Sequence, residues 1–110
     1  MGKLIDQAVQ HFSNLEVREI RIPEWTEEVL YAKNLTLSDM AKLSTRAQDD
    51  TWDYMCYAII FSLVDAAGEA VFDIGDKPKL KNHTSKSVME RVASEILAAQ
   101  TETEEERAKN

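Results

Sequence analysis

The side chains that bind transition metals most strongly, apart from carboxylates, are His11, Cys56 and His83. They lie far apart in the sequence and show no paired spacing, such as Cys-x-x-Cys, that brings two ligands to one ion. A single histidine is typical of a helix surface or cap. Cys56 stands among apolar residues, where a thiol packs as a small hydrophobic group. The sequence therefore predicts no metal site, no cofactor and no cysteine nucleophile.

Two groups of carboxylates remain as candidates for acid–base chemistry: Asp49, Asp50 and Asp53, and the run from Glu102 to Glu106. General acid–base catalysis needs carboxyl groups in a partly dry cleft. The first group instead precedes a predicted helix, where acidic side chains interact favourably with the helix dipole. The second group lies in a hydrophilic segment. A small hydrolase or metal enzyme is thus the least favoured hypothesis, and we expect no catalytic residues and no enzymatic activity.

The elements that would position any functional residue are mainly helical. The chain has 110 residues, of which 44% are hydrophobic, and only 3 Gly and 2 Pro. Few turn residues favour long helices over a many-stranded sheet. We expect a mainly α fold with about four helices packed around a central apolar helix, and a small N-terminal β-hairpin over residues 16–34. Residues 1–100 would form a single helical domain, and residues 101–110 an acidic flexible tail.

Helical periodicity predicts helices over residues 3–13, from Thr36 onward, over 50–64 and over about 85–99, with an irregular connector over 73–83. Thr36 and Asp39 have the spacing of a capping box. In the helix that they open, one face is expected to contain Leu37, Met40, Ala41, Ser44 and Ala47. The helix over 50–64 has two apolar stripes. One runs from Trp52 through Cys56 and Ile59 to Val64, and the other contains Tyr54, Tyr57, Ala58 and Phe61.

The net charge is −7, so the average surface repels nucleic acid and anionic lipid. Residues 76–91 are a local exception, with five basic side chains: Lys77, Lys79, Lys81, Lys86 and Arg91. A small regulatory or nucleic-acid-binding helical protein using residues 77–91 is therefore the alternative hypothesis. This segment has no interleaved aromatic residues, which argues against nucleic acid as a partner.

Neither a targeting signal nor a membrane span is apparent. The N-terminus has no hydrophobic signal-peptide region. The longest apolar stretch, from Met55 to Val64, is about half of the length needed to cross a bilayer. We expect no membrane partner. A single cysteine excludes an intrachain disulfide and is compatible with a reducing cytosol.

Three stretches, taken in order over residues 16–110, resemble the tail assembly chaperones of long-tailed, siphophage-type bacteriophages. The first contains the turn Pro23-Glu24-Trp25 between two extended runs, followed by a Leu-Thr helix start at Leu35-Thr36. The second is the Asp-x-x-Gly-x-x-x-Phe segment from Asp65 through Gly68 to Phe72. The third is a helix from Ser85 to Ala99 followed by an acidic stretch. The segment Phe72 to Pro78 departs from the family pattern.

The resemblance implies a protein without catalytic residues that binds the tape measure protein during tail morphogenesis. It also implies contact with the tail tube protein, directly or through a longer frameshifted product. The place of action would be the cytoplasm of the infected bacterial host, and the protein would not remain in the mature virion.

The candidate partner-binding residues are Trp25, Tyr54, Tyr57 and Phe61. The last three form the second apolar stripe of the 50–64 helix, and two interpretations stay open for them. They are either core residues or an exposed aromatic surface. An exposed surface would be suited to a partner or to a homo-oligomer that grows with concentration, because aromatic side chains are effective interface anchors.

Overall fold

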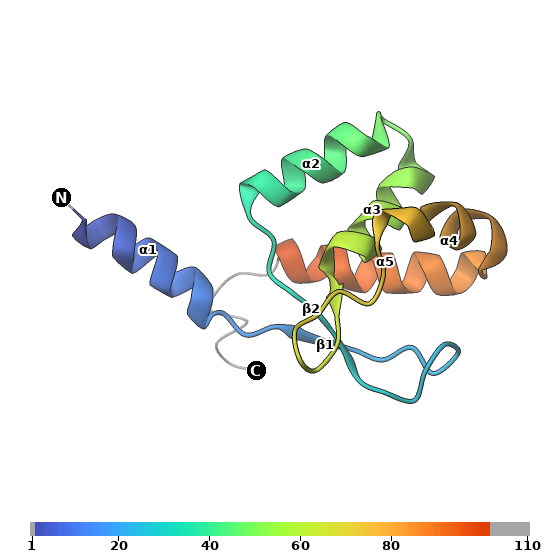
Figure 1. The fold of residues 1–110 in the computed structure, drawn as a ribbon, viewed down its shortest axis with the longest axis horizontal. Coiled ribbons are helices and arrows are strands. Elements are labelled where there is room, and N and C mark those ends of the chain that lie inside the picture. The colour runs from blue at the N-terminus through green and yellow to red at the C-terminus, as the bar shows by residue number, and fades with distance from the viewer. Residues whose placement is uncertain (1, 102–110) are drawn as a thin grey trace.

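A computed structural model describes residues 2–101, and within them the fold is mainly α, as predicted (Figure 1). The elements in order are α1 (Lys3–Asn14), β1 (Arg18–Ile20), β2 (Leu30–Ala32), α2 (Leu37–Ala47), α3 (Thr51–Ser62), β3 (Leu63–Val64), the 3-10 turn η1 (Ile74–Asp76), α4 (Lys77–His83) and α5 (Lys86–Thr101). The described residues thus contain five α-helices, one more than expected. The predicted acidic tail lies outside them from residue 102 onward.

The central apolar helix is α3, which packs against α2, α4 and α5. Its residues Cys56, Ala58, Ile59 and Ile60 are buried. A helix with apolar side chains nearly all round needs neighbours on several sides, and this helix has them. The core that it shares with the strands and the other helices includes Ile20, Ile22, Leu30, Ala32, Leu63, Leu80, Val88, Val92 and Ile96.

The predicted hairpin is present, and a third strand extends it. β1 pairs antiparallel with β2, from Arg18 opposite Ala32 to Ile20 opposite Leu30. On its other edge β2 pairs antiparallel with β3, so that β2 is the middle strand. The helix expected to continue to residue 64 therefore ends at Ser62. Its last two expected residues, Leu63 and Val64, hydrogen-bond to a strand that lies far away in the sequence.

The predicted helix starts of α2 and α3 are confirmed by their caps. The Thr36 hydroxyl accepts a hydrogen bond from the Asp39 amide at 3.1 Å, and the Asp39 carboxylate accepts one from the Thr36 amide at 3.0 Å. This is a complete capping box. At α3, the Asp50 carboxylate accepts a hydrogen bond from the Asp53 amide at 3.0 Å. The acidic group at residues 49–53 thus includes the residue that caps α3.

Two residues of the predicted apolar faces are exposed. Leu37 is 91% exposed and Trp52 is 49% exposed. α2 instead buries Leu43 and Ala47, while Ala41 and Ser44 face solvent. Of the predicted face, Ala47 is buried and Met40 is half-buried, so the buried face of α2 overlaps the predicted one only in part. Both exposed side chains lie in the first turn of their helices.

The connector over residues 73–83 is helical rather than irregular, which corrects the prediction. The turn η1 leads directly into α4, and Pro78 lies in the first turn of that helix. Proline is well suited to this position because the amide that it lacks would have no partner within the helix. Leu80 then points into the core.

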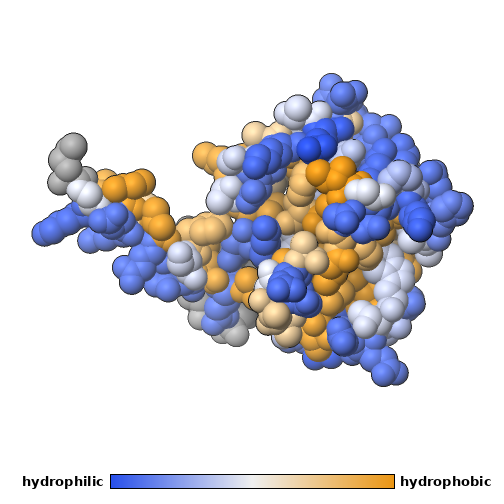
Figure 2. All heavy atoms as spheres, viewed as in Figure 1, coloured by the Kyte–Doolittle hydropathy of each residue, from blue (hydrophilic) through white to orange (hydrophobic). Residues whose placement is uncertain are grey.

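α1 projects from the body of the molecule as an arm (Figure 1). It begins where the prediction placed it and ends one residue later, at Asn14, but none of its residues is buried. Figure 2 shows hydrophobic atoms along the side of α1 that is turned toward α2, and hydrophilic atoms along the other side. Among the described residues, the apolar face of α1 is therefore not buried against the other elements.

Candidate partner-binding surfaces

The aromatic residues of the second stripe of α3 are neither fully buried, as core residues would be, nor fully exposed. Tyr54, Tyr57 and Phe61 are all half-buried. Tyr57 and Phe61 pack against the core and stack on each other, with ring centroids 6.0 Å apart and an interplanar angle of 19°. Because part of each ring still contacts solvent, the stripe can contribute both to the core and to a binding surface.

Tyr57 and Tyr54 face different hollows. Tyr57 lines a hollow of about 630 Å³ whose other lining residues all belong to α2 or its C-cap: Ser38, Ala41, Lys42, Thr45, Arg46 and Gln48. The Lys77 ammonium lies 5.9 Å from the centroid of the Tyr57 ring. Tyr54 lines a hollow of about 290 Å³ with residues that include Ala47, Met55 and Leu97. The structure thus brings Tyr57 and Phe61 together, while Tyr54 lies beside them in a separate depression.

Trp25 forms a third surface with Phe72. The two rings meet edge to face, with centroids 5.9 Å apart and an interplanar angle of 87°. Together with Leu30, Val71 and Leu80 they line a largely apolar hollow of about 420 Å³. This hollow shares no lining residue with the one beside Tyr57. Trp25 and the α3 stripe are therefore two surfaces rather than one continuous site.

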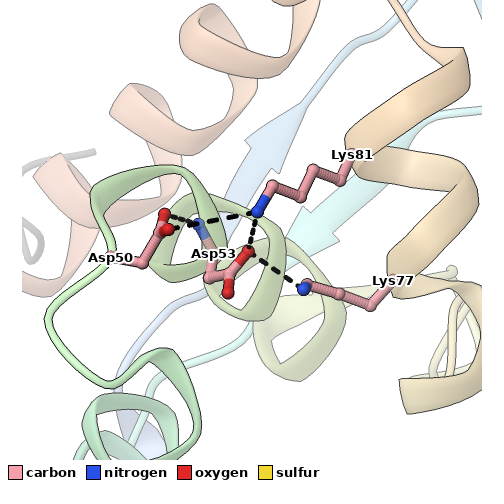
Figure 3. Close-up of polar contacts among 4 residues, drawn as sticks. All are labelled: Asp50, Asp53, Lys77 and Lys81. Atoms are coloured by element: carbon pink, nitrogen blue, oxygen red, sulfur yellow. Dashed lines mark hydrogen bonds and ion pairs between the residues drawn. The ribbon is translucent and has the colours of Figure 1, made fainter.

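Lysines of α4 bind the acidic start of α3 (Figure 3). The Lys81 ammonium lies 2.7 Å from an Asp53 carboxylate oxygen, and the Lys77 ammonium lies 3.0 Å from the same oxygen. Lys81 also lies 4.0 Å from Asp50. Hydrogen bonds from the two lysines, with the larger effect from Lys81, hold the pKa of Asp53 below its ordinary value of 3.8. The cluster joins α3 to α4 and neutralises two charges of the basic segment.

Two more basic side chains of residues 76–91 are also paired. The two terminal guanidinium nitrogens of Arg91, Nη1 and Nη2, each donate to one oxygen of the Glu24 carboxylate at 2.7 Å, the bidentate geometry of a strong charge-assisted pair. The Arg91 hydrogen bond lowers the pKa of Glu24 from 4.5 to about 2. Lys86 pairs with Glu90 one helical turn further on. Four of the five basic groups thus have acidic partners within the chain.

No family model matches this chain, and no curated protein matches it in sequence. Its structure is similar to a solved one described as the structure of bacteriophage HK97 tail assembly chaperone. The match covers 90% of this chain and 98% of the HK97 chain, with a TM-score of 0.57 and 12% sequence identity. This chain has the fold of a tail assembly chaperone.

Within this tail assembly chaperone fold, two of the stretches that carry the sequence resemblance meet in space. Trp25 of the Pro-Glu-Trp turn contacts Phe72, which closes the Asp-x-x-Gly-x-x-x-Phe segment. At the start of that segment the Asp65 carboxylate accepts hydrogen bonds from the amides of Ala67 and Glu69, at 2.9 and 3.0 Å. Gly68 has a φ of 84°, which side chains other than glycine rarely adopt. The motif residues thus build a turn that holds Phe72 against Trp25.

The histidines and the cysteine do not form a metal site within the described residues. Among residues 2–101, no group of three or more His, Cys, Asp or Glu side chains lies close enough to hold a metal ion. Cys56 is buried, and burial raises the pKa of its thiol, so the thiol stays protonated at neutral pH. In this same part of the chain, no helix has the length and apolar character needed to span a bilayer.

Sequence reasoning missed two exposed apolar features, Trp52 and the arm. The Lys86 ammonium lies 5.6 Å from the centroid of the Trp52 ring, which covers part of this half-exposed side chain. The exposure of Trp52 could have been predicted from its position in the first turn of α3. Residues at the end of a helix often extend beyond the neighbouring elements that would cover them. No comparable signal shows that the apolar face of α1 stays uncovered.

Proposed function

We propose that this chain is a tail assembly chaperone that binds the tape measure protein while a phage tail is built. Contact with the tail tube protein, directly or through a longer frameshifted product, is part of the proposal. So is self-association of the chain. The protein would act in the cytoplasm of the infected host and would leave before the virion is complete. The proposal includes no catalytic step.

The observation that carries this proposal is the fold shared with the HK97 tail assembly chaperone over nearly the whole of both chains. The sequence resemblance supports it independently, because its motif residues meet at Trp25 and Phe72. A chaperone of this kind also needs apolar surface that can hold a hydrophobic partner. The half-buried stripe at Tyr57 and the hollow beside Trp25 offer such surface.

The alternative, a nucleic-acid-binding role for residues 77–91, has less support in the structure. Binding to a phosphate backbone depends on lysines and arginines whose charge is available. Here Lys77 and Lys81 bind Asp53, and Arg91 binds Glu24. The positive charge of this segment is largely neutralised within the chain.

Co-expression with the tape measure protein of the same phage tests the proposal. We expect this chain to raise the soluble fraction of the tape measure protein and to co-purify with it, because the apolar faces of the chaperone cover those of its partner. An unchanged soluble fraction would remove the main support for the chaperone role.

The variant Tyr57→Glu places a charge on the aromatic stripe and should weaken this effect. The matched control is Ser94→Glu, which adds the same charge at an exposed position of α5. Circular dichroism of both variants establishes whether they are folded. If Tyr57→Glu is folded and as effective as the parent chain, the stripe does not bind the tape measure protein.

A further inference from the structure

Two basic side chains of α2 line the hollow beside Tyr57, and neither forms an ion pair within residues 2–101. Lys42 and Arg46 lie four residues apart, one turn of the helix, and both are exposed. No acidic residue lines this hollow. By contrast, four of the five basic side chains of residues 76–91 bind carboxylates of the chain. The positive charge at the hollow is therefore free to bind an anionic ligand.

The one acidic residue of α2 does not neutralise this charge. Asp39 precedes Lys42 by three residues, but its carboxylate accepts the hydrogen bond from the Thr36 amide that completes the capping box. That hydrogen bond has the largest effect in lowering the pKa of Asp39, and Lys42 has a smaller one. Lys42 and Arg46 also repel each other, because like charges one turn apart weaken a helix. Carboxylates of a ligand would relieve this repulsion.

The other residues of the hollow leave room for a second helix. Those contributed by α2 are short: Ser38, Ala41 and Thr45. Short side chains allow the backbone of another helix to approach closely. Tyr57 provides an aromatic ring that is half-buried and stacks on Phe61, so part of its apolar surface remains for contact. An aromatic ring, short side chains and two cations together suit a helix with one apolar and one acidic face.

We propose that this hollow binds an acidic amphipathic helix of a protein partner. Two carboxylates one turn apart on that helix pair with Lys42 and Arg46, and an apolar side chain beside them contacts the Tyr57 ring. This binding mode rests on the proposed function and specifies it, since the partner would be a helical segment of the tape measure protein.

Charge decides between this occupant and two others. A basic helix would meet Lys42 and Arg46 with like charge, which costs affinity. A nucleic acid depends on many contacts between cations and phosphates, whereas the hollow offers two cations in a chain with a net charge of −7. An acidic helix is complementary in both charge and spacing.

Synthetic peptides and the full chain test the proposal. The probe is a fluorescently labelled helical peptide of about five turns, with leucines along one face and two glutamates one turn apart beside them. Two matched peptides have glutamine or lysine in place of the glutamates. Fluorescence anisotropy measures the dissociation constant of each peptide at low and at high salt.

The variant Lys42→Glu/Arg46→Glu reverses the charge of the hollow. Its matched control, Lys3→Glu/Lys79→Glu, makes the same change in net charge at exposed positions of α1 and α4 that do not line the hollow. All four side chains are exposed, so both variants should fold, and circular dichroism checks this. Lys42→Gln/Arg46→Gln removes the charge without reversing it and serves as a milder second variant.

We expect the parent chain and the control to bind the glutamate peptide about tenfold more tightly than the lysine peptide. Lys42→Glu/Arg46→Glu should reverse this preference, and Lys42→Gln/Arg46→Gln should abolish it. High salt should weaken binding of the glutamate peptide to the parent chain more than binding of the glutamine peptide, because salt screens the ion pairs.

Equal affinity of the parent chain for the three peptides, or no binding of the glutamate peptide, overturns the proposal. So does a control that loses as much affinity as Lys42→Glu/Arg46→Glu. Stronger binding of a DNA duplex than of the glutamate peptide, lost in the same variant, would assign the hollow to nucleic acid instead. If the peptides behave as expected but the soluble fraction of the tape measure protein does not rise, the acidic-helix site stands and the chaperone role falls. If that fraction rises but the glutamate peptide does not bind, the chaperone role stands and the site falls.

Discussion

At the scale of single residues, three ion pairs made by two carboxylates connect parts of the chain that lie far apart in the sequence. Glu24 in the β1–β2 loop binds Arg91 of α5, and Asp53 of α3 binds Lys77 and Lys81 of α4. Both carboxyl groups have a lowered pKa, because the bound cations favour the charged form. The folded state is therefore stabilised where these carboxylates are ionised, and less so in acid.

The Glu24 pair predicts a defined dependence of stability on pH. Its pKa is lowered from 4.5 to about 2, so its contribution is complete above pH 4.5 and is lost as the pH falls to about 2. The melting temperature of the parent chain should exceed that of Glu24→Gln at neutral pH, and the difference should vanish over this range. Thermal melts at several pH values measure it. Glu27→Gln, in the same loop, is the control. A difference that is constant down to pH 2 would contradict this assignment.

Truncating an apolar side chain should destabilise the fold strongly in the buried helix α3 and very little in the projecting helix α1. Ile59 of α3 is fully buried, and Ile59→Ala should lower the free energy of unfolding by about 2–5 kcal/mol. Leu4 of α1 is 78% exposed, and Leu4→Ala should change it by less than about 0.5 kcal/mol. Denaturant unfolding at a concentration that keeps the chain monomeric measures both. A large loss for Leu4→Ala would mean that the arm packs on its own body.

At the scale of elements, the features predicted correctly from the sequence are those that depend on residues close together in the chain. The Thr36–Asp39 capping box and the Asp50 cap need only residues three positions apart, so their pattern is visible in the sequence. The amphipathic pattern of residues 3–13 likewise predicted α1. The apolar residues of α3 on nearly all sides predicted a central, covered helix, and the structure confirms it.

The features that sequence reasoning missed depend on contacts between distant segments. Leu63 and Val64 continue an apolar helical pattern, but they pair with β2 and form β3. Pro78 suggested an irregular connector, although it lies in the first turn of α4. The candidate surface was only partly predictable for the same reason. The pattern identified Tyr57 and Phe61, but which part of their rings stays exposed depends on how α2 and α4 pack beside them.

At the scale of the whole molecule, the chain combines a compact body with a projecting arm (Figure 1). The body has the fold of a tail assembly chaperone, and its aromatic hollows lie on surfaces separate from the arm. We propose that copies of this chain associate, because linked copies bind an extended partner more strongly than single ones, since each contact raises the effective concentration for the next.

We propose that this chain keeps a tape measure protein soluble by binding it directly. The most direct test dilutes the purified tape measure protein out of denaturant and follows its aggregation by light scattering. We expect this chain to suppress the scattering in proportion to the amount added, and we expect an unrelated acidic protein of similar size at the same concentration to leave it unchanged. Equal scattering with this chain and with the unrelated protein would contradict the claim.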